Sequence, residues 1–188
     1  MRVIVIGIDP SLTGTAVAVR APNGEIDVGR FASKPCGKRI EDRLARCYGL
    51  RAAVSRFIRD ETEQVARSVG VPLPAVCFIE GYSYNSKGSV IATAEFGGLL
   101  REMLDGMCFA KGITEVSPAT VKRFAVKGNA SKTEVVAALT RRYGVEFSTD
   151  DEYDAYALAR LGAVVEGLER PQNGNQLAAA EAVRKARA

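Results

Sequence analysis

The sequence predicts a single α/β domain with a mixed β-sheet, on the basis of three observations. Three strand-like apolar segments lie within residues 2–31, and from residue 40 onward helical patterns alternate with two further short apolar strands. This order favours helices packed against a sheet that contains both parallel and antiparallel strands. The length of 188 residues suits one domain, and no internal repeat or dividing linker interrupts it.

The first half of the chain is predicted to contain four strands and one long helix. "RVIVIGID" at 2–9 is a nearly continuous apolar run, as expected for a strand buried on both faces. Two strands follow around the Pro-Asn-Gly turn at 22–24. A helix is expected from about residue 40 to 68, where "VPLP" ends it, and "AVCFIE" at 75–80 is the next strand.

The second half is predicted to be mainly helical, with the short strand "ITEVS" at 113–117. Helices are expected at 90–110, from Ser117 with Pro118 in its first turn, from 132 to Gly144, and at 151–168. Residues 169–188 are alanine-rich with a basic end, and we expect either a frayed helix or disorder there. The folded domain is therefore expected to span 1–168, followed by a basic tail.

Composition excludes several kinds of chemistry. The chain has no histidine, which rules out Ser-His-Asp and Cys-His nucleophile systems within it. Its four cysteines have no C-x-x-C spacing, which argues against a structural zinc site and favours reduced, buried thiols. The N-terminal apolar run is too short for a signal peptide, and no run approaches the ~20 residues of a membrane helix. We therefore expect a cytoplasmic protein with no membrane partner.

The net charge of +4 is mild, but basic residues are concentrated in one region. Residues 111–142 contain only two acids, Glu115 and Glu134, against seven basic residues: Lys111, Lys122, Arg123, Lys127, Lys132, Arg141 and Arg142. A local basic patch of this kind is compatible with a polyanionic partner such as nucleic acid.

The segment "STDDEYDAYALARLG" at 148–162 directs acids toward a helix face that should be buried. Counting in helical steps from Asp154 reaches only apolar positions: Leu158, Leu161 and Val165. Asp151 lies one turn earlier on the same face. Because an unpaired buried charge costs several kcal/mol, Asp154 needs partners. Asp151 is equally compatible with an ordinary helix-start acid, and Asp150 is expected to be the helix cap.

Two more acids, Asp9 and Glu80, end apolar strands. If these strands are parallel, both acids emerge at the carboxyl edge of the sheet, where ligands of open α/β sheets bind. Four carboxylates meeting there would repel one another unless divalent cations were bound, and oxygen-only ligands suit Mg²⁺ or Mn²⁺. Two such ions ~3.5–4 Å apart are the usual arrangement for cutting phosphodiesters. The structural alternatives are a turn opened by Asp9 before Pro10 and a strand exit at Glu80.

Four segments, in this order, resemble the sequential motifs of the RuvC-type Holliday junction resolvases: "VIGIDPSLTGTAVAV", "CFIEGY", "VSPATVKRFAVKGNASKTEVV" and "DDEYDAYALA". The resemblance runs from residue 3 to about 165, and its specificity lies in the order and spacing of the motifs together. It implies an RNase H-like fold with a five-stranded mixed sheet flanked by helices. It also implies a metal-dependent endonuclease that nicks branched DNA in recombination and repair, and that acts as a homodimer.

The resemblance assigns roles to individual residues. The catalytic and metal-binding acids would be Asp9, Glu80, Asp151 and Asp154, holding two Mg²⁺ ions for which Mn²⁺ can substitute. The two lysines of the family near the DNA correspond to Lys122 and Lys132, with Lys132 close to the chemistry. Without the resemblance, a solvated helix face would be the simpler interpretation of both. The neighbouring Arg123 and Lys127 are predicted to contact the DNA backbone.

The loop after Glu80 departs from the family pattern. The family places an aromatic wedge there, usually a phenylalanine three residues beyond the glutamate, whereas this chain has Ser83 flanked by Tyr82 and Tyr84. We expect one of these tyrosines to stack on a base, which is worth roughly 1–3 kcal/mol; packing on the protein itself is the alternative. Lys87 in the same loop is a further predicted DNA contact.

Extra residues in the first long helix and the basic tail indicate a divergent, viral relative, which would act in the host-cell cytoplasm. Two other functions fit parts of the sequence. "GIDPSLTG" also resembles the phosphate loop of actin-like phosphotransferases, although those need a second such domain and this chain is too short. A non-catalytic DNA-binding module of the same fold is the other alternative, but a lost carboxylate would be expected in it.

Overall fold

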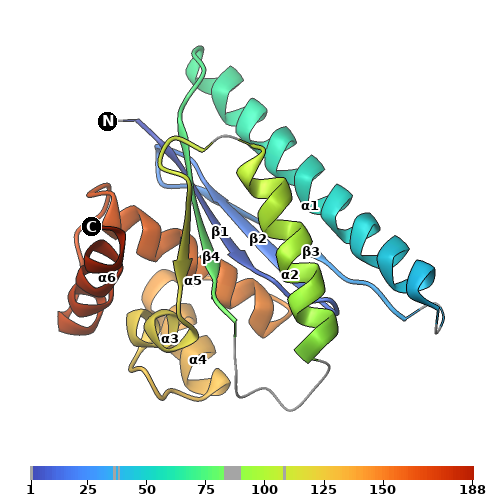
Figure 1. Cartoon of the computed structure of the whole chain (residues 1–188). Coiled ribbons are helices and arrows are strands. Elements are labelled where there is room, and N and C mark those ends of the chain that lie inside the picture. The colour runs from blue at the N-terminus through green and yellow to red at the C-terminus, as the bar shows by residue number, and fades with distance from the viewer. Residues whose placement is uncertain (1, 36, 38, 83–89, 108) are drawn as a thin grey trace.

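The computed structural model describes residues 2–35, 37, 39–82, 90–107 and 109–188, and within them it contains a five-stranded sheet with helices on both faces (Figure 1). The strand order is β3-β2-β1-β4-β5. The strands are β1 (Ile4–Asp9), β2 (Thr15–Arg20), β3 (Ile26–Phe31), β4 (Ala75–Glu80) and β5 (Ile113–Val116). β1 pairs antiparallel with β2 and parallel with β4. The predicted fold class, an α/β domain with a mixed sheet, is confirmed.

Two layers of helices enclose this sheet. On one face lie α1 (Ile40–Val69) and α2 (Val90–Asp105); on the other lie α3 (Pro118–Ala125), α4 (Lys132–Tyr143), α5 (Asp150–Val165) and α6 (Gly174–Arg187). β1 is buried along its whole length because its side chains alternate between the two layers. Ile6 belongs to the core beside α1 and α2, and Val5 belongs to the core beside α3, α5 and α6.

α5 lies unusually close to β1, and glycine makes this approach possible. A Cβ atom on Gly7 would lie 2.4 Å from the backbone oxygen of Ala155 and from the backbone nitrogen of Ala159. On the helix side of the same contact, a Cβ atom on Gly162 of α5 would lie 2.6 Å from the side chains of Val5 and Phe78. The helix is therefore seated directly on the central strands, which fixes its N-terminal turn against the carboxyl ends of β1 and β4.

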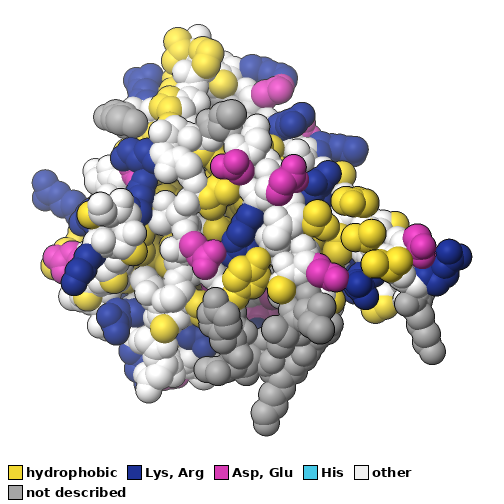
Figure 2. Space-filling view, in the orientation of Figure 1, with side chains coloured by type: hydrophobic (Ala, Val, Ile, Leu, Met, Phe, Trp, Pro, Cys, Tyr) yellow, Lys and Arg dark blue, Asp and Glu magenta, His cyan; other side chains and the backbone are white. Residues whose placement is uncertain are grey.

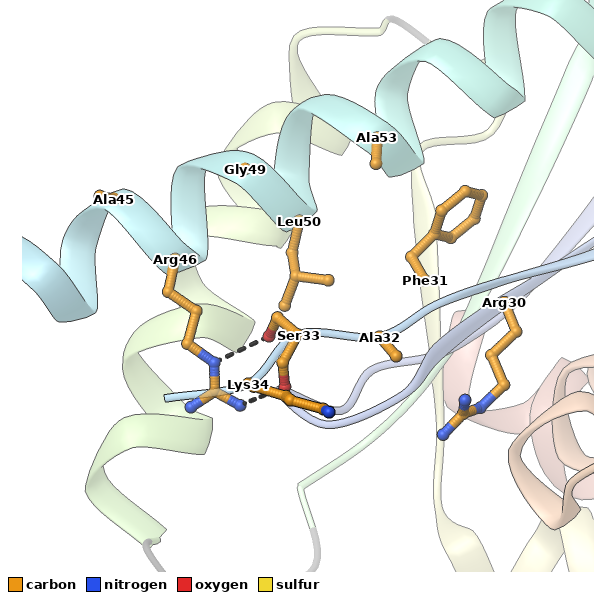
Figure 3. A pocket seen from close by; sticks show the side chains of 10 residues that line it. All are labelled: Arg30, Phe31, Ala32, Ser33, Lys34, Ala45, Arg46, Gly49, Leu50 and Ala53. Carbon is orange, nitrogen blue, oxygen red and sulfur yellow. Dashed lines mark hydrogen bonds between the residues drawn. The ribbon is translucent and has the colours of Figure 1, made fainter. Parts of the chain in front are cut away.

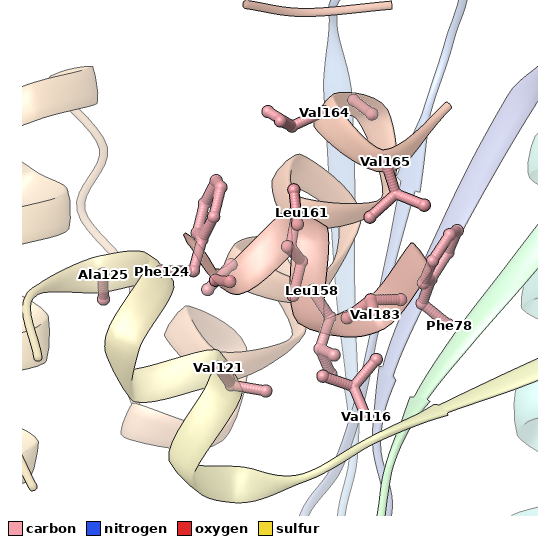
Figure 4. Close-up of a cluster of buried hydrophobic side chains, with 14 of the residues drawn as sticks. Phe78, Val116, Val121, Phe124, Ala125, Leu158, Leu161, Val164, Val165 and Val183 are labelled. Carbon is pink, nitrogen blue, oxygen red and sulfur yellow. The ribbon is translucent and has the colours of Figure 1, made fainter. Parts of the chain in front are cut away.

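The C-terminal segment differs from its prediction. A helix, one of the two expected states of this segment, is present, but it is neither frayed nor disordered, because α6 is packed into the core formed with α3 and α5 (Figure 4). Ala179, Ala180 and Val183 are buried there, and the Arg184 Nε donates a hydrogen bond of 3.1 Å to the Val165 backbone oxygen. The alanines provide a flat face for close helix packing.

The helix boundaries otherwise follow the predictions within a few residues. The largest difference is in α2, which ends at Asp105 instead of residue 110, because the chain turns at Gly106. Gly70 ends α1 in the left-handed conformation with φ of 79°, as a glycine allows. In the described part of the chain, no helix combines the length and hydropathy needed to span a bilayer.

Candidate active site

The four predicted acids lie around one cavity at the carboxyl edge of the sheet. Asp9 and Glu80 end the parallel neighbours β1 and β4, and Asp151 and Asp154 project from the first turns of α5. All four line a cavity of about 540 Å³, together with residues of the turn after β1 and of α2, α3 and α4. Asp9, at 8% exposure, is the most buried of the four. The strand ends and the seating of α5 on β1 thus bring together residues that are up to 145 positions apart in the sequence.

The start of α5 is organised differently from the sequence-based expectation. Thr149, and not Asp150, is the N-cap residue, and its backbone N–H donates a hydrogen bond of 2.9 Å to the Glu152 carboxylate. The Asp150 carboxylate instead accepts a hydrogen bond from the Lys132 ammonium group. Because Thr149 and Glu152 complete the cap, the carboxylates of Asp151 and Asp154 are left for the cavity.

Burial and mutual repulsion raise the pKa values of the acids in the cavity. Burial, reinforced by the charges of Glu80 and Asp154, raises the pKa of Asp9 well above its ordinary value. Burial, followed by repulsion from Asp154, raises the pKa of Glu80 to about 7. Burial likewise raises the pKa of Asp154 to about 6, although Lys132 opposes this shift. Positive charge around these carboxylates is therefore too weak to stabilise all of them in ionised form.

Two of the predicted basic residues, Lys122 and Lys132, line the same cavity. The hydrogen bond to Asp150 raises the pKa of Lys132 and holds its ammonium group at the rim. Arg123 and Lys127 are not among the residues that line this cavity. Arg123 is exposed on α3, and Lys127 forms an ion pair of 2.9 Å with Glu134.

The basic region at 111–142 is partly neutralised. Among the residues that the structure describes, Lys111, Lys127 and Lys132 pair with Glu166, Glu134 and Asp150, respectively. Basic and acidic side chains are also interspersed across the molecular face seen in Figure 2. The patch predicted from the sequence is therefore reduced to its unpaired members near the cavity, above all Lys122.

Tyr82, the first of the two predicted stacking tyrosines, packs on the protein itself. The Arg101 guanidinium lies over its ring at 4.3 Å from the centroid, and a Cβ atom on Gly97 would lie 2.8 Å from the ring. Arg101 is held in turn by Glu115, at 2.9 Å, and by the Glu80 backbone oxygen, at 3.3 Å. The predicted roles of Ser83, Tyr84 and Lys87 concern positions outside the described residues.

Sequence reasoning missed two arginines that do not line the cavity but contact residues that do: Arg30 and Arg101. The Arg30 Nε donates a hydrogen bond of 3.3 Å to Asp151 Oδ2, across 121 residues of sequence. Arg101 joins β4, β5 and α2 through the contacts given above. Neither arginine belongs to a recognisable motif, and only their outward positions on a strand and a helix hint at a polar partner.

The donor set at the cavity fits a divalent cation. Within the described portion of the chain, no three carboxylates or thiols lie close enough together to form a metal site as they stand. The charges of Glu80, Asp154 and Asp151 nevertheless all raise the pKa of Asp9, so the four carboxylates act on one another. A bound Mg²⁺ or Mn²⁺ would relieve this repulsion by placing positive charge among oxygen ligands alone.

A second hollow, of about 580 Å³, lies between β3 and α1 (Figure 3). No acid lines it, and its main polar group is already bound, because Arg46 donates hydrogen bonds to the Ser33 hydroxyl and to the Leu12 backbone oxygen. Although this hollow is slightly larger, the acid cavity is the one with groups available for chemistry.

Comparison with protein-family models and with curated proteins finds no match. Among solved structures, the chain is similar to RuvC of Thermus thermophilus, with a TM-score of 0.57 and 19% identity over 83% of this chain and 90% of that one. It is also similar to T. thermophilus RuvC in complex with a Holliday junction substrate, with a TM-score of 0.58 and the same identity and coverage. The chain therefore has the RuvC-like, RNase H-like fold that its motifs implied.

Proposed function

We propose that this protein is a divalent-cation-dependent endonuclease that nicks branched DNA, with the Holliday junction as its substrate. The convergence of Asp9, Glu80, Asp151 and Asp154 in one cavity beside Lys122 and Lys132 carries the proposal. The likeness in fold to a RuvC solved with a Holliday junction supports the class of substrate. By analogy with the family, two cavities in a homodimer would act on opposed strands.

The four carboxylates would hold two Mg²⁺ ions, or Mn²⁺ in their place. When bound at such a site, the metal supplies an activated water and stabilises charge on the phosphodiester oxygens. Asp9 is central to this set, because it is the most buried of the four and the charges of the other three acids all act on it. In the hydrolysis, water oxygen bonds to phosphorus, the bond from phosphorus to the 3′ oxygen breaks, and a 3′ hydroxyl and a 5′ phosphate result.

The lysines provide the positive charge that the acids lack. Lys132 and Lys122 lie on the α3–α4 side of the cavity, where they would pair with phosphates on either side of the scissile bond. Lys132 is held in place for this by Asp150. Arg123 and Lys127 would extend the contact along the backbone, which predicts binding that weakens with salt and depends little on sequence.

A fluorescently labelled four-way junction tests the proposal directly. With Mg²⁺ the parent protein should nick the junction, whereas the Asp9→Asn variant should bind it without nicking. The matched control is Asp60→Asn, because Asp60 is exposed on α1 and does not line the cavity. Junction binding by the parent protein without nicking would favour a non-catalytic DNA-binding module instead.

Two additional measurements define the substrate and exclude the other enzyme class. A panel of flaps, forks and bubbles, compared at equal concentration, should be cut more slowly than the four-way junction. ATP hydrolysis in the absence of DNA would favour an actin-like phosphotransferase, and the nuclease proposal predicts none.

A further inference from the structure

Arg30 connects three separate segments at the edge of the acid cavity. It projects from β3 away from α1 (Figure 3), and its Nε donates a hydrogen bond of 3.3 Å to Asp151 Oδ2 at the start of α5. Its Nη2 also reaches the Thr13 backbone oxygen, at 3.5 Å, in the turn that follows Asp9. Arg30 does not itself line the acid cavity, whereas Asp151 does. The guanidinium therefore binds Asp151 from outside the cavity.

Gly14 provides the space for this ion pair. A Cβ atom at position 14 would lie 2.3 Å from Arg30 Nη2 and 2.4 Å from Asp151 Oδ2, closer than any side chain permits. The conformation of Gly14 itself does not demand glycine, because its φ is not in the left-handed region. A side chain at position 14 would therefore be accommodated only if the ends of the Arg30 and Asp151 side chains moved.

The ion pair contributes geometry more than stability. The side chains of Arg30 and Asp151 are 31% and 22% exposed, so water screens much of their attraction. The guanidinium nevertheless contacts Oδ2 of Asp151, which restricts rotation of the carboxylate, and this contact does not engage the other oxygen. Hydrogen bonds of this kind to carboxylates that bind metals typically alter metal affinity 10–100-fold.

We propose that Arg30 is a positioning residue that orients Asp151 as a ligand for a divalent cation. The absence of a side chain at Gly14 leaves room for the two side chains to meet. This inference rests on the proposed metal-dependent nuclease site, and it concerns the metal affinity of that site. It assigns no direct contact between Arg30 and the DNA.

Binding of Mn²⁺ to the full-length protein without DNA, measured by calorimetry, tests the inference. Arg30→Gln should weaken Mn²⁺ binding by ~10-fold or more. The direction is decisive, because removal of a positive charge near four acids would by electrostatics alone strengthen cation binding. Unchanged or tighter binding by Arg30→Gln would overturn the inference.

Two further variants separate charge from geometry. Gly14→Ala retains the arginine but displaces the pair, and it should weaken Mn²⁺ binding as Arg30→Gln does. Arg30→Lys retains the charge without the guanidinium geometry, and a loss of several-fold is expected. Mn²⁺ affinities equal to the parent value in both variants would contradict the positioning role.

The controls are Arg59→Gln, an exposed position on α1, and Gly49→Ala, where a Cβ atom would meet no atom within 4 Å. Both should bind Mn²⁺ as the parent does, and circular dichroism should show every variant folded. Absence of Mn²⁺ binding by the parent itself would overturn the proposed metal site. Normal binding by the parent that Arg30→Gln leaves unaffected would overturn only the role of Arg30.

Discussion

The two ends of α5 carry buried acids in opposite electrostatic settings. Just beyond its C-terminus, the Glu166 side chain is only 4% exposed and is bound by Lys111 and by Arg187. Glu169, three residues later, is bound by Arg20 at 2.8 Å and by Arg160 at 3.2 Å. Each acid at this end therefore has two cations.

At the N-terminal end the balance is reversed. Asp9, Glu80, Asp151 and Asp154 share one cavity with two lysines, and one of these lysines is already engaged by Asp150. Burial raises the pKa of Glu166 as well, but hydrogen bonds from Lys111 and Arg187 outweigh it and lower the pKa below its ordinary value. Burial of carboxylates alone is thus common to both ends; the shortage of cations distinguishes the cavity and indicates a site that receives them.

The largest expected effect is loss of nicking when an acid of the cavity is neutralised. Glu80→Gln and Asp154→Asn should each lower the nicking rate at saturating Mg²⁺ by about 10³-fold or more, since a lost metal contact removes several kcal/mol of transition-state stabilisation. Single-turnover cleavage of a labelled junction measures this. As the control, the affinity of both variants for the junction in EDTA should stay close to the parent value. Nicking rates close to the parent rate would contradict a special role for the acids at the N-terminal end of α5.

Neutralising an acid at the opposite end should affect stability instead. Glu166→Gln removes the carboxylate that Lys111 and Arg187 bind. It should lower the free energy of unfolding by about 2 kcal/mol, because it leaves positive charge without its counter-ion. Urea unfolding followed by circular dichroism measures the loss. Nicking at 25 °C should persist in this variant, and a nicking defect without loss of stability would contradict a purely structural role.

The pH dependence of stability should also distinguish the ends. Folding raises the pKa of Glu80 to about 7 and that of Asp154 to about 6, through burial first, so the folded protein holds more protons than the unfolded chain between about pH 4 and pH 7. In EDTA, the free energy of unfolding should therefore fall by several kcal/mol as pH rises through this window, at about 1.4 kcal/mol per unit change in pKa, and level off above it.

Urea unfolding at pH 5 and pH 8 tests that slope. Asp154→Asn should flatten it by removing one of the titrating groups, and Mg²⁺ should restore stability at pH 8 in the parent protein. A parent protein in EDTA that is more stable at pH 8 than at pH 5 would argue against the raised pKa values.

The smallest expected effect concerns two lysines of the basic region. Lys122→Ala should weaken junction binding by about 3–10-fold, because Lys122 lies in the cavity. The slope of log affinity against log salt concentration should become shallower by about one. Lys127→Ala should have a smaller effect, since Glu134 already neutralises that ammonium group. Fluorescence anisotropy between 50 and 200 mM salt measures both affinities. Equal losses of junction affinity in the two variants would contradict a larger contribution from the lysine in the cavity.

The sequence was most informative where local periodicity determines which face of a helix, or which end of a strand, a side chain occupies. Asp154 was identified because it interrupts an apolar helical stripe, and Asp9 and Glu80 because each ends a buried strand. Contacts between distant segments were not predictable in this way. The Arg30–Asp151 pair joins residues 121 positions apart, and its geometry depends on how closely α5 is seated on the sheet.

The C-terminal helix was mispredicted for a related physical reason. Its alanines are compatible with a disordered tail, with a frayed helix or with close helix packing, and only the surfaces of α3 and α5 decide among these. Asp150 was assigned as the cap because acids are common at helix starts, whereas Thr149 and Glu152 complete the cap together. Asp150 is thereby left to hold Lys132.

Anomalous diffraction from crystals soaked in Mn²⁺ tests most directly whether the four carboxylates form a cation site. We predict anomalous density between Asp9, Glu80, Asp151 and Asp154, and loss of that density in the Asp9→Asn variant. Anomalous density confined to exposed acids such as Asp60, with none in the cavity, would contradict the account.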